Sequence, residues 1–190
     1  MNSLCKAGMP LAFVLGAGSA LAVGYGTTAT IDGTPYVVGG SGSPIQRLGD
    51  SISFSLPNAI AVGTTPKTIT LTYTVTADPG TRLVRNEQIA TGQNTGAATS
   101  LFTTLYTATP TVETSTQANG AGNAFQMYAY NFASPMLAYN VTTTLQLNPA
   151  GGVSKASAFT SHFTQSPVPE PISIAALALG LAGLVRRKRS

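Results

Sequence analysis

The chain of 190 residues has few of the side chains on which most enzyme chemistry depends. Charged residues make up 8% of it, and it has one histidine, one cysteine and no tryptophan. A typical globular domain is about 25% charged, so few ionised groups are left here for acid–base or metal chemistry. We therefore expect that the chain is not an enzyme and holds no cofactor.

The charge that is present is concentrated at the two ends of the chain. The formal net charge is +4, but between Val23 and Pro167 five Lys and Arg residues are balanced by five Asp and Glu residues. The excess cations are Lys6 near the N-terminus and a basic cluster at residues 186–189. Because the central part is neutral, it lacks the basic surface that a nucleic-acid partner requires.

The N-terminus has the pattern of a secretory signal peptide. Lys6 precedes a mostly apolar stretch that is shorter than a membrane span and closes on the small residues Ala20 and Ala22. This pattern predicts a signal helix over residues 1–22, with cleavage after Ala22. Cys5 would leave with the signal, so the mature chain would have neither a disulfide nor a thiol.

The C-terminus combines three features in a fixed order. A proline-flanked glutamate comes first, then residues 172–185 with one polar member, then a cluster of cations. A helix over 172–185 would span about 21 Å, less than the ~30 Å of a hydrocarbon core, which predicts a marginal transmembrane helix. The cations place the rest of the chain on the far side of the membrane, and the prolines keep Glu170 extended and open to a protease. The residues of this pattern are Val168, Pro169, Glu170, Pro171, Arg186, Arg187, Lys188 and Arg189.

This arrangement resembles the PEP-CTERM sorting signal of Gram-negative bacteria. The resemblance covers residues 167–190 and implies that an exosortase, a membrane enzyme, processes the chain near the tripeptide Pro169-Glu170-Pro171. It further implies export, transient anchoring in the inner membrane, removal of the tail, and release or attachment at the cell surface or in exopolysaccharide. The alternative is an ordinary single-pass anchor.

Residues 23–166 are long enough for one globular domain and have the composition of β-structure. Threonine alternates with apolar residues, most clearly from Lys67 to Ala77, where one face is apolar and the other is hydroxylated. Such alternation predicts a half-buried antiparallel strand. We therefore predict an all-β fold, an antiparallel β-sandwich, with a β-barrel as the alternative.

Turn residues divide this domain into further strands. Asp78-Pro79-Gly80 predicts a turn that joins the strand ending at Ala77 to a second strand over residues 82–89, as a hairpin. Other strands are predicted at 51–56, 101–109, 124–132, 139–148 and 158–164. Residues 25–42 and 90–100, rich in Gly, Thr, Asn and Ser, are predicted to be loops or irregular edges.

Few residues are candidates for catalysis. His162 alternates with aromatic residues, and the chain has no Gly-x-Ser-x-Gly motif, so we interpret this histidine as an ordinary strand residue. Asp78 and Glu87 are the one carboxylate pair whose closeness the sequence suggests, but a turn role for Asp78 and a surface ion pair between Glu87 and Arg85 are favoured. No metal-binding spacing is present.

Candidate sugar contacts are also few. Tyr128 and Tyr130 share a face of their predicted strand and are the candidate stacking platform. Phe125 and Met127 make the opposite face apolar too, which favours a central core strand over a sugar platform. Asn140 begins a glycosylation sequon, and the outward threonines are candidates for O-linked sugars.

These observations predict an exported protein of the cell surface or extracellular matrix, with a structural or adhesive role in an exopolysaccharide biofilm. The expected partners are an exosortase, transiently the inner membrane, and exopolysaccharide. One alternative is a polysaccharide-binding module, which needs accessible aromatic residues. A second is a secreted hydrolase, which needs a carboxylate pair or a Ser–His pair converging in a pocket.

Overall fold

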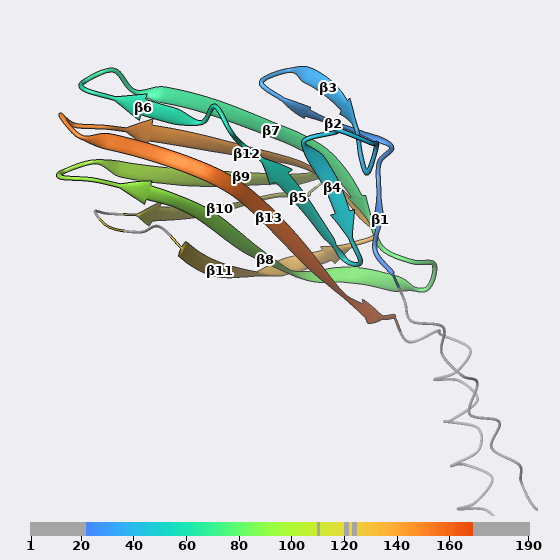
Figure 1. Ribbon diagram of the computed structural model, residues 1–190. Coiled ribbons are helices and arrows are strands. Elements are labelled where there is room, and N and C mark those ends of the chain that lie inside the picture. The colour runs from blue at the N-terminus through green and yellow to red at the C-terminus, as the bar shows by residue number, and fades with distance from the viewer. Residues whose placement is uncertain (1–21, 110, 120–121, 123–124, 169–190) are drawn as a thin grey trace, which may run out of the picture.

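The structure is a computed structural model that describes residues 22–109, 111–119, 122 and 125–168. Its thirteen strands form two antiparallel sheets that face each other (Figure 1). The predicted all-β sandwich is therefore confirmed, and the sheets do not close into a barrel. The predicted transmembrane helix and all of the predicted signal helix except Ala22 lie outside the described residues.

The first sheet has the order β10-β9-β12-β7-β2-β3, and β1 pairs with the end of β7. Its strands are β10 (Thr111–Asn119), β9 (Thr99–Ala108), β12 (Ala138–Asn148), β7 (Lys67–Thr76), β2 (Thr28–Ile31), β3 (Thr34–Val37) and β1 (Gly24–Tyr25). The second sheet has the order β11-β8-β13-β5-β4, and β6 pairs with β13. Its strands are β11 (Phe125–Met136), β8 (Thr81–Asn94), β13 (Val153–Pro167), β5 (Ser51–Ser55), β4 (Ile45–Leu48) and β6 (Ile60–Val62).

The alternation of apolar and hydroxyl residues sets which face of each sheet is buried. On β7, Leu71 and Val75 are fully buried while Thr74 and Thr76 are exposed, as the period of two predicts. Neighbouring β12 repeats the pattern, with the side chains of Tyr139, Val141, Leu145 and Leu147 in the core. The apolar faces of both sheets thus meet in one core, and the threonines cover the outer face of the first sheet.

The predicted hairpin between β7 and β8 is wrong, although its turn is right. The amide of Thr81 donates to the carbonyl of Asp78 at 3.0 Å, and Gly80 has a φ of 80°. The turn carries the chain from one sheet to the other, because β7 pairs with β12, β1 and β2 while β8 pairs with β11 and β13. A local turn motif does not choose the strand partner, which is decided by packing between distant segments.

The structure also contains strands that the sequence did not predict. Residues 25–42, predicted as loop or irregular edge, include β2 and β3, joined by Asp32-Gly33 with positive φ at both positions. That dipeptide is a strong signal for a tight hairpin. β4, β6 and β10 were likewise not predicted, and β8 continues to Asn94 beyond its predicted end. The expectation of a central core strand over residues 124–132 is wrong, because β11 is an edge strand and Met127 is 66% exposed.

A buried polar network crosses the core between the sheets. The amide nitrogen of Gln88 on β8 donates to the Tyr106 hydroxyl of β9 at 2.7 Å, and that hydroxyl donates to Asn86 Oδ1 at 2.8 Å. Thr104 contacts Gln88 on one side and Thr143 of β12 on the other. Because each group is fully or almost fully buried and has a partner, the network satisfies polar atoms that would otherwise destabilise the core.

Candidate binding pocket

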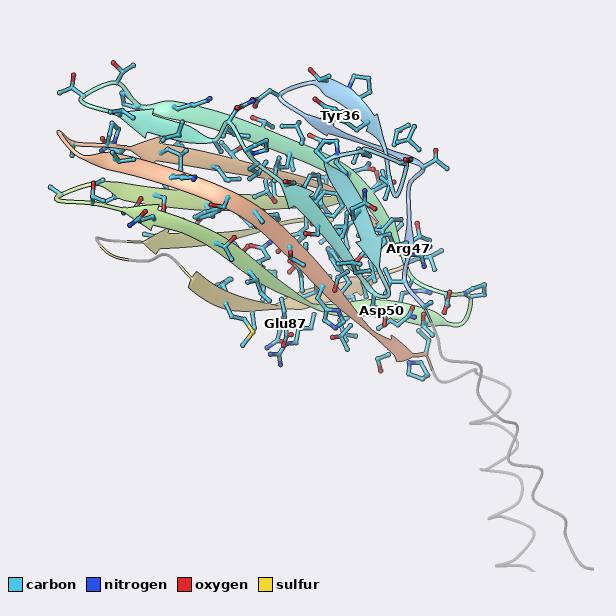
Figure 2. All side chains as sticks on the ribbon, viewed as in Figure 1. Tyr36, Arg47, Asp50 and Glu87 are labelled. Carbon is cyan, nitrogen blue, oxygen red and sulfur yellow. The ribbon has the colours of Figure 1, made fainter. Side chains whose placement is uncertain are left out.

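The candidate site is a pocket on one long side of the sandwich. This side, which we name the open edge, is formed by the short strands β2 and β3 of one sheet and β4 and β5 of the other. The pocket has a volume of about 230 Å³. Its walls combine apolar and polar side chains, and among them are Asp32, Tyr36, Leu56, Pro57, Asn58 and Lys67. Figure 2 shows Tyr36 on this side of the molecule, at β3.

Local structure holds the polar groups of the pocket in place. Asp32 has a φ of 50°, the left-handed region that Asp tolerates better than most residues, and its Oδ1 accepts a hydrogen bond from the Thr70 amide at 2.7 Å. Lys67 Nζ donates to the carbonyl of Asn58 at 2.5 Å. The turn between β2 and β3 is thereby fixed to β7, and the ammonium group is held against the loop after β5.

The chemistry of the pocket suits a small hydroxylated ring. The half-buried ring of Tyr36 and the ring of Pro57 offer apolar surface, while the Asp32 carboxylate, the Asn58 amide and the Lys67 ammonium offer acceptors and donors. Pockets for drug-sized ligands usually measure ~300–1,000 Å³, so this one is matched to something smaller.

Tyr128 and Tyr130, the candidate sugar platform that the sequence disfavoured, do not form an outward surface. They pair in register with Gln88 and Asn86, whose side chains are buried between the sheets, so the two tyrosines face inward as well. Tyr130 stacks on Tyr106 with 5.4 Å between ring centroids, and its hydroxyl donates to Glu113 at 3.0 Å. Burial and the Glu113 carboxylate both raise the pKa of Tyr130. A polysaccharide-binding role therefore loses the residues first proposed for it.

His162 lies in β13 as predicted and has neighbours on both sides. Its Nδ1 is 3.2 Å from the hydroxyl of Ser51 on β5, and Glu87 on β8 is its direct cross-strand partner. The expected ion pair is confirmed, because Arg85 Nη2 lies 2.6 Å from Glu87 Oε1. One row on the outer face of the second sheet contains Ser51, His162 and Glu87. The sequence did not predict this row because the three residues come from distant segments.

The candidate carboxylate pair, Asp78 and Glu87, is not brought together. Asp78 lies in the turn before β8, where its carboxylate accepts a hydrogen bond from Gln165 at 3.2 Å. Glu87 follows about six strand residues later, roughly 20 Å away at ~3.3 Å per residue. A glycosidase pair needs a separation of about 5–10 Å, so these two carboxylates cannot form one. In the described part of the chain, no three His, Cys, Asp or Glu side chains group as a metal site.

The described part of the chain begins and ends at the same end of the sandwich (Figure 1). Ala22 is exposed, and Gly24 pairs with Thr76 at the end of β7. The amide of Val168 donates to the carbonyl of Gly80, in the turn that follows β7. Ala20 and the rest of the sorting pattern lie outside the described residues, and none of the described residues forms a helix able to cross a membrane.

Comparison with known proteins gives one family match and distant structural likenesses that include the following two. A structure of TmCBM61 in complex with β-1,4-galactotriose is 10% identical, with a TM-score of 0.36, over 79% of this chain and 90% of that one. The enzymatically active domain of tailspike protein 4 of bacteriophage CBA120 is 15% identical, with a TM-score of 0.28, over 79% and 20%. Scores this low carry no argument about function. No curated protein matches the chain.

The family match falls on the C-terminal pattern described above. The PEP-CTERM protein-sorting motif matches residues 167–190, beginning at the last residue of β13. The match supports export, processing by an exosortase at the membrane, and a final location outside the cell or on its surface. The chain therefore carries a PEP-CTERM protein-sorting motif at its C-terminus.

Proposed function

We propose that the folded part of this exported protein is a structural or adhesive component of an exopolysaccharide matrix. The ends of the folded part lie together, so a tail held in the membrane leaves the opposite end of the sandwich free to reach outward (Figure 1). The outer face of the first sheet is uncharged and rich in hydroxyls, with Thr72 of β7 in register with Thr142 of β12. Such a surface hydrogen-bonds to glycans without repelling either neutral or acidic ones.

A second candidate function, polysaccharide binding, is favoured by one observation, the pocket at the open edge. Its volume of about 230 Å³ and its mixture of apolar faces with polar groups fit a single sugar ring of a longer chain. Tyr36 supplies the stacking face, and Asp32 and Asn58 supply hydrogen bonds to ring hydroxyls. The proposed stacking residue is therefore Tyr36, in place of Tyr128 and Tyr130.

We propose a binding role and not a catalytic one for the domain. Ser51 and His162 meet on the outer face of a sheet, on strands whose backbone amides are engaged in ladder hydrogen bonds. An acyl-transfer site needs free amide donors beside the nucleophile to stabilise an oxyanion. Around His162 the strand β13 pairs with β5 on one side and β8 on the other, so its amides there are engaged in the ladder.

Sorting is tested by the intact mass of the protein from cells with and without the exosortase. The wild-type product should lack Arg186–Arg189, while the product from exosortase-deficient cells should retain them. Glu170→Ala should leave full-length protein in the inner membrane. A wild-type product that keeps the basic cluster would contradict exosortase processing.

Glycan binding is tested by co-sedimentation of the exported protein with purified exopolysaccharide. Tyr36→Ala should weaken binding about tenfold or more, because it removes the stacking face. Leu48→Ala is the matched control, since Leu48 lies on the same edge, is 65% exposed and is not among the pocket residues. Equal binding by both variants would rule out the pocket, and no binding by the wild type would leave the structural role alone.

A further inference from the structure

Val23, the first residue after the predicted signal cleavage, is built into the body of the protein. Ala22 is exposed, whereas Val23 is 0% exposed, so the border between accessible and buried chain falls on the bond between them. The backbone nitrogen of Val23 donates a hydrogen bond to Asp50 Oδ1 at 2.9 Å. The group that cleavage after Ala22 would turn into a free amine thus already contacts a carboxylate.

Asp50 is a carboxylate in need of a cation. It lies half-buried between β4 and β5. Among the described residues the one ion pair within 4 Å is between Arg85 and Glu87, so Asp50 has no described cationic side chain at that distance. The backbone of Asp50 is fixed from two directions, because its carbonyl accepts hydrogen bonds from the Tyr25 hydroxyl at 2.6 Å and from the Phe163 amide at 3.2 Å. A partly desolvated carboxylate held in place gains more from a cationic partner than from an amide.

Arg47 holds the carbonyl group of Val23. Its Nη2 donates to the carbonyl of Val23 at 2.9 Å, and its guanidinium carbon lies 5.9 Å from the centre of the Tyr25 ring. Burial and the Asp50 carboxylate raise the pKa of Tyr25, which keeps its hydroxyl protonated as a donor. Figure 2 shows Arg47 and Asp50 at the end of the sandwich where the described chain begins.

The geometry points to a binding site for the chain's own new N-terminus, in which Asp50 receives the α-ammonium group of Val23 formed when the signal peptide is removed. Hydrolysis of the Ala22–Val23 amide consumes one water and gives the Ala22 carboxylate and the Val23 ammonium. The amide hydrogen bond to Asp50 becomes a charge-assisted ion pair, which is about twice as strong.

This ion pair would join the two sheets only after export. β1, which begins at Gly24, belongs to the first sheet, and Asp50 precedes β5 of the second. Val23 lies between them with both of its backbone polar groups held by side chains of the second sheet. The precursor has the weaker amide contact, so the folded body becomes more stable when the signal is cleaved.

The first test locates the N-terminus and measures its reactivity in the full exported chain. N-terminal sequencing should give Val23 as the first residue. An acylating reagent at pH 7 should modify that amine at least tenfold more slowly in the wild type than in Asp50→Asn, because the paired ammonium must first be released. A mature chain that starts elsewhere, or equal rates in both proteins, would overturn the assignment.

The second test separates the ion pair from a merely structural role of Asp50. Asp50→Asn is made in the cleaved protein and in an uncleaved form with Ala20→Gln and Ala22→Gln, both purified in the same detergent. The substitution should lower the unfolding midpoint about 5 °C more in the cleaved form. Glu87→Gln, the matched control, removes a carboxylate of the same sheet and should shift both forms equally. Equal shifts for Asp50→Asn would contradict the ion pair.

Discussion

The two long sides of the sandwich end in different ways. The side opposite the open edge, which we name the closed edge, is formed by β10 of one sheet and β11 of the other. There Glu113, which is 8% exposed, accepts hydrogen bonds from the Tyr130 hydroxyl at 3.0 Å and from the amides of Ala133 and Ser134 at 2.9 and 3.0 Å. At the open edge the strands are short, with four residues each in β2, β3 and β4 and five in β5, and a pocket remains there.

The difference separates a side built for stability from a side available for binding. The pairing of β11 with β8 is interrupted between Asn131 and Met136, which frees the amides that Glu113 binds. The carboxylate thus ties the irregular part of β11 to β10 and leaves no donor unsatisfied there. At the open edge the sheets are tied by single hydrogen bonds, among them those from Lys67 Nζ to the Asn58 carbonyl and from the Val23 amide to Asp50, so the side chains of the pocket can change with less cost to the fold.

The largest expected effect is alkaline destabilisation, which falls mainly on the closed side. Burial raises the pKa of Tyr106 and Tyr139, and Tyr25, Tyr73 and Tyr130 are raised as well. A raised folded pKa contributes stability that is present below the unfolded value near ~10 and is lost as the pH rises above it. Each fully buried tyrosine, such as Tyr106, should cost up to about 1.4 kcal/mol per pH unit above ~10.

Urea unfolding at pH 8, 10 and 11 measures how steeply the free energy of unfolding falls with pH. Tyr106→Phe should reduce this slope by the contribution of one tyrosine. A slope that Tyr106→Phe leaves unchanged would show that the closed side does not govern the alkaline transition.

Next in size is the substitution Glu113→Ala at the closed edge. It leaves the amides of Ala133 and Ser134 without their acceptor in a buried place, which should cost about 3–5 kcal/mol. Glu87→Gln removes a more exposed carboxylate from the outer face and should cost less than about 1 kcal/mol. Both are measured by urea unfolding at pH 7, and similar losses in the two variants would abolish the contrast between a structural and a surface carboxylate.

The smallest expected effect is that of Asp32→Asn at the open edge. Asn tolerates the left-handed conformation and keeps an oxygen to accept the Thr70 amide, so stability should change by no more than about 0.5 kcal/mol. The loss of the carboxylate should still weaken exopolysaccharide binding, as measured by co-sedimentation. A loss of stability as large as that of Glu113→Ala would show that the open edge is also structural.

The sequence predicted best where one face of a strand is apolar. β7 and β12 were predicted almost to the residue because their buried positions are apolar and their outward positions are polar. β10 was missed because its buried positions include Glu113 and Ser115, so no apolar alternation marks it. The hairpin of β2 and β3 was missed although Asp32-Gly33 carries the turn signal, because the surrounding glycines and threonines favoured a loop.

The candidate site was less predictable than the fold. The pocket joins Asp32, Tyr36 and Asn58 with Lys67, and no short motif connects these residues. Tyr128 and Tyr130 were identified as sharing a face, but their strand lies at an edge with that face turned inward. Which face of a strand is buried depends on the sheet packed against it, and a strand with apolar residues on both faces does not specify this.

The sequence by itself determined how the protein is handled: the sorting motif, the expected signal peptide, the neutral central part and the β-rich composition are all local features, readable in a single stretch of chain. The tertiary structure decided everything that depends on pairing between distant segments. It placed β7 and β8 in different sheets, left a pocket at one edge and a buried carboxylate at the other, and set Asp50 against Val23. The physical reason is that strand partners are chosen by side-chain packing over long sequence separations, which local propensity does not encode.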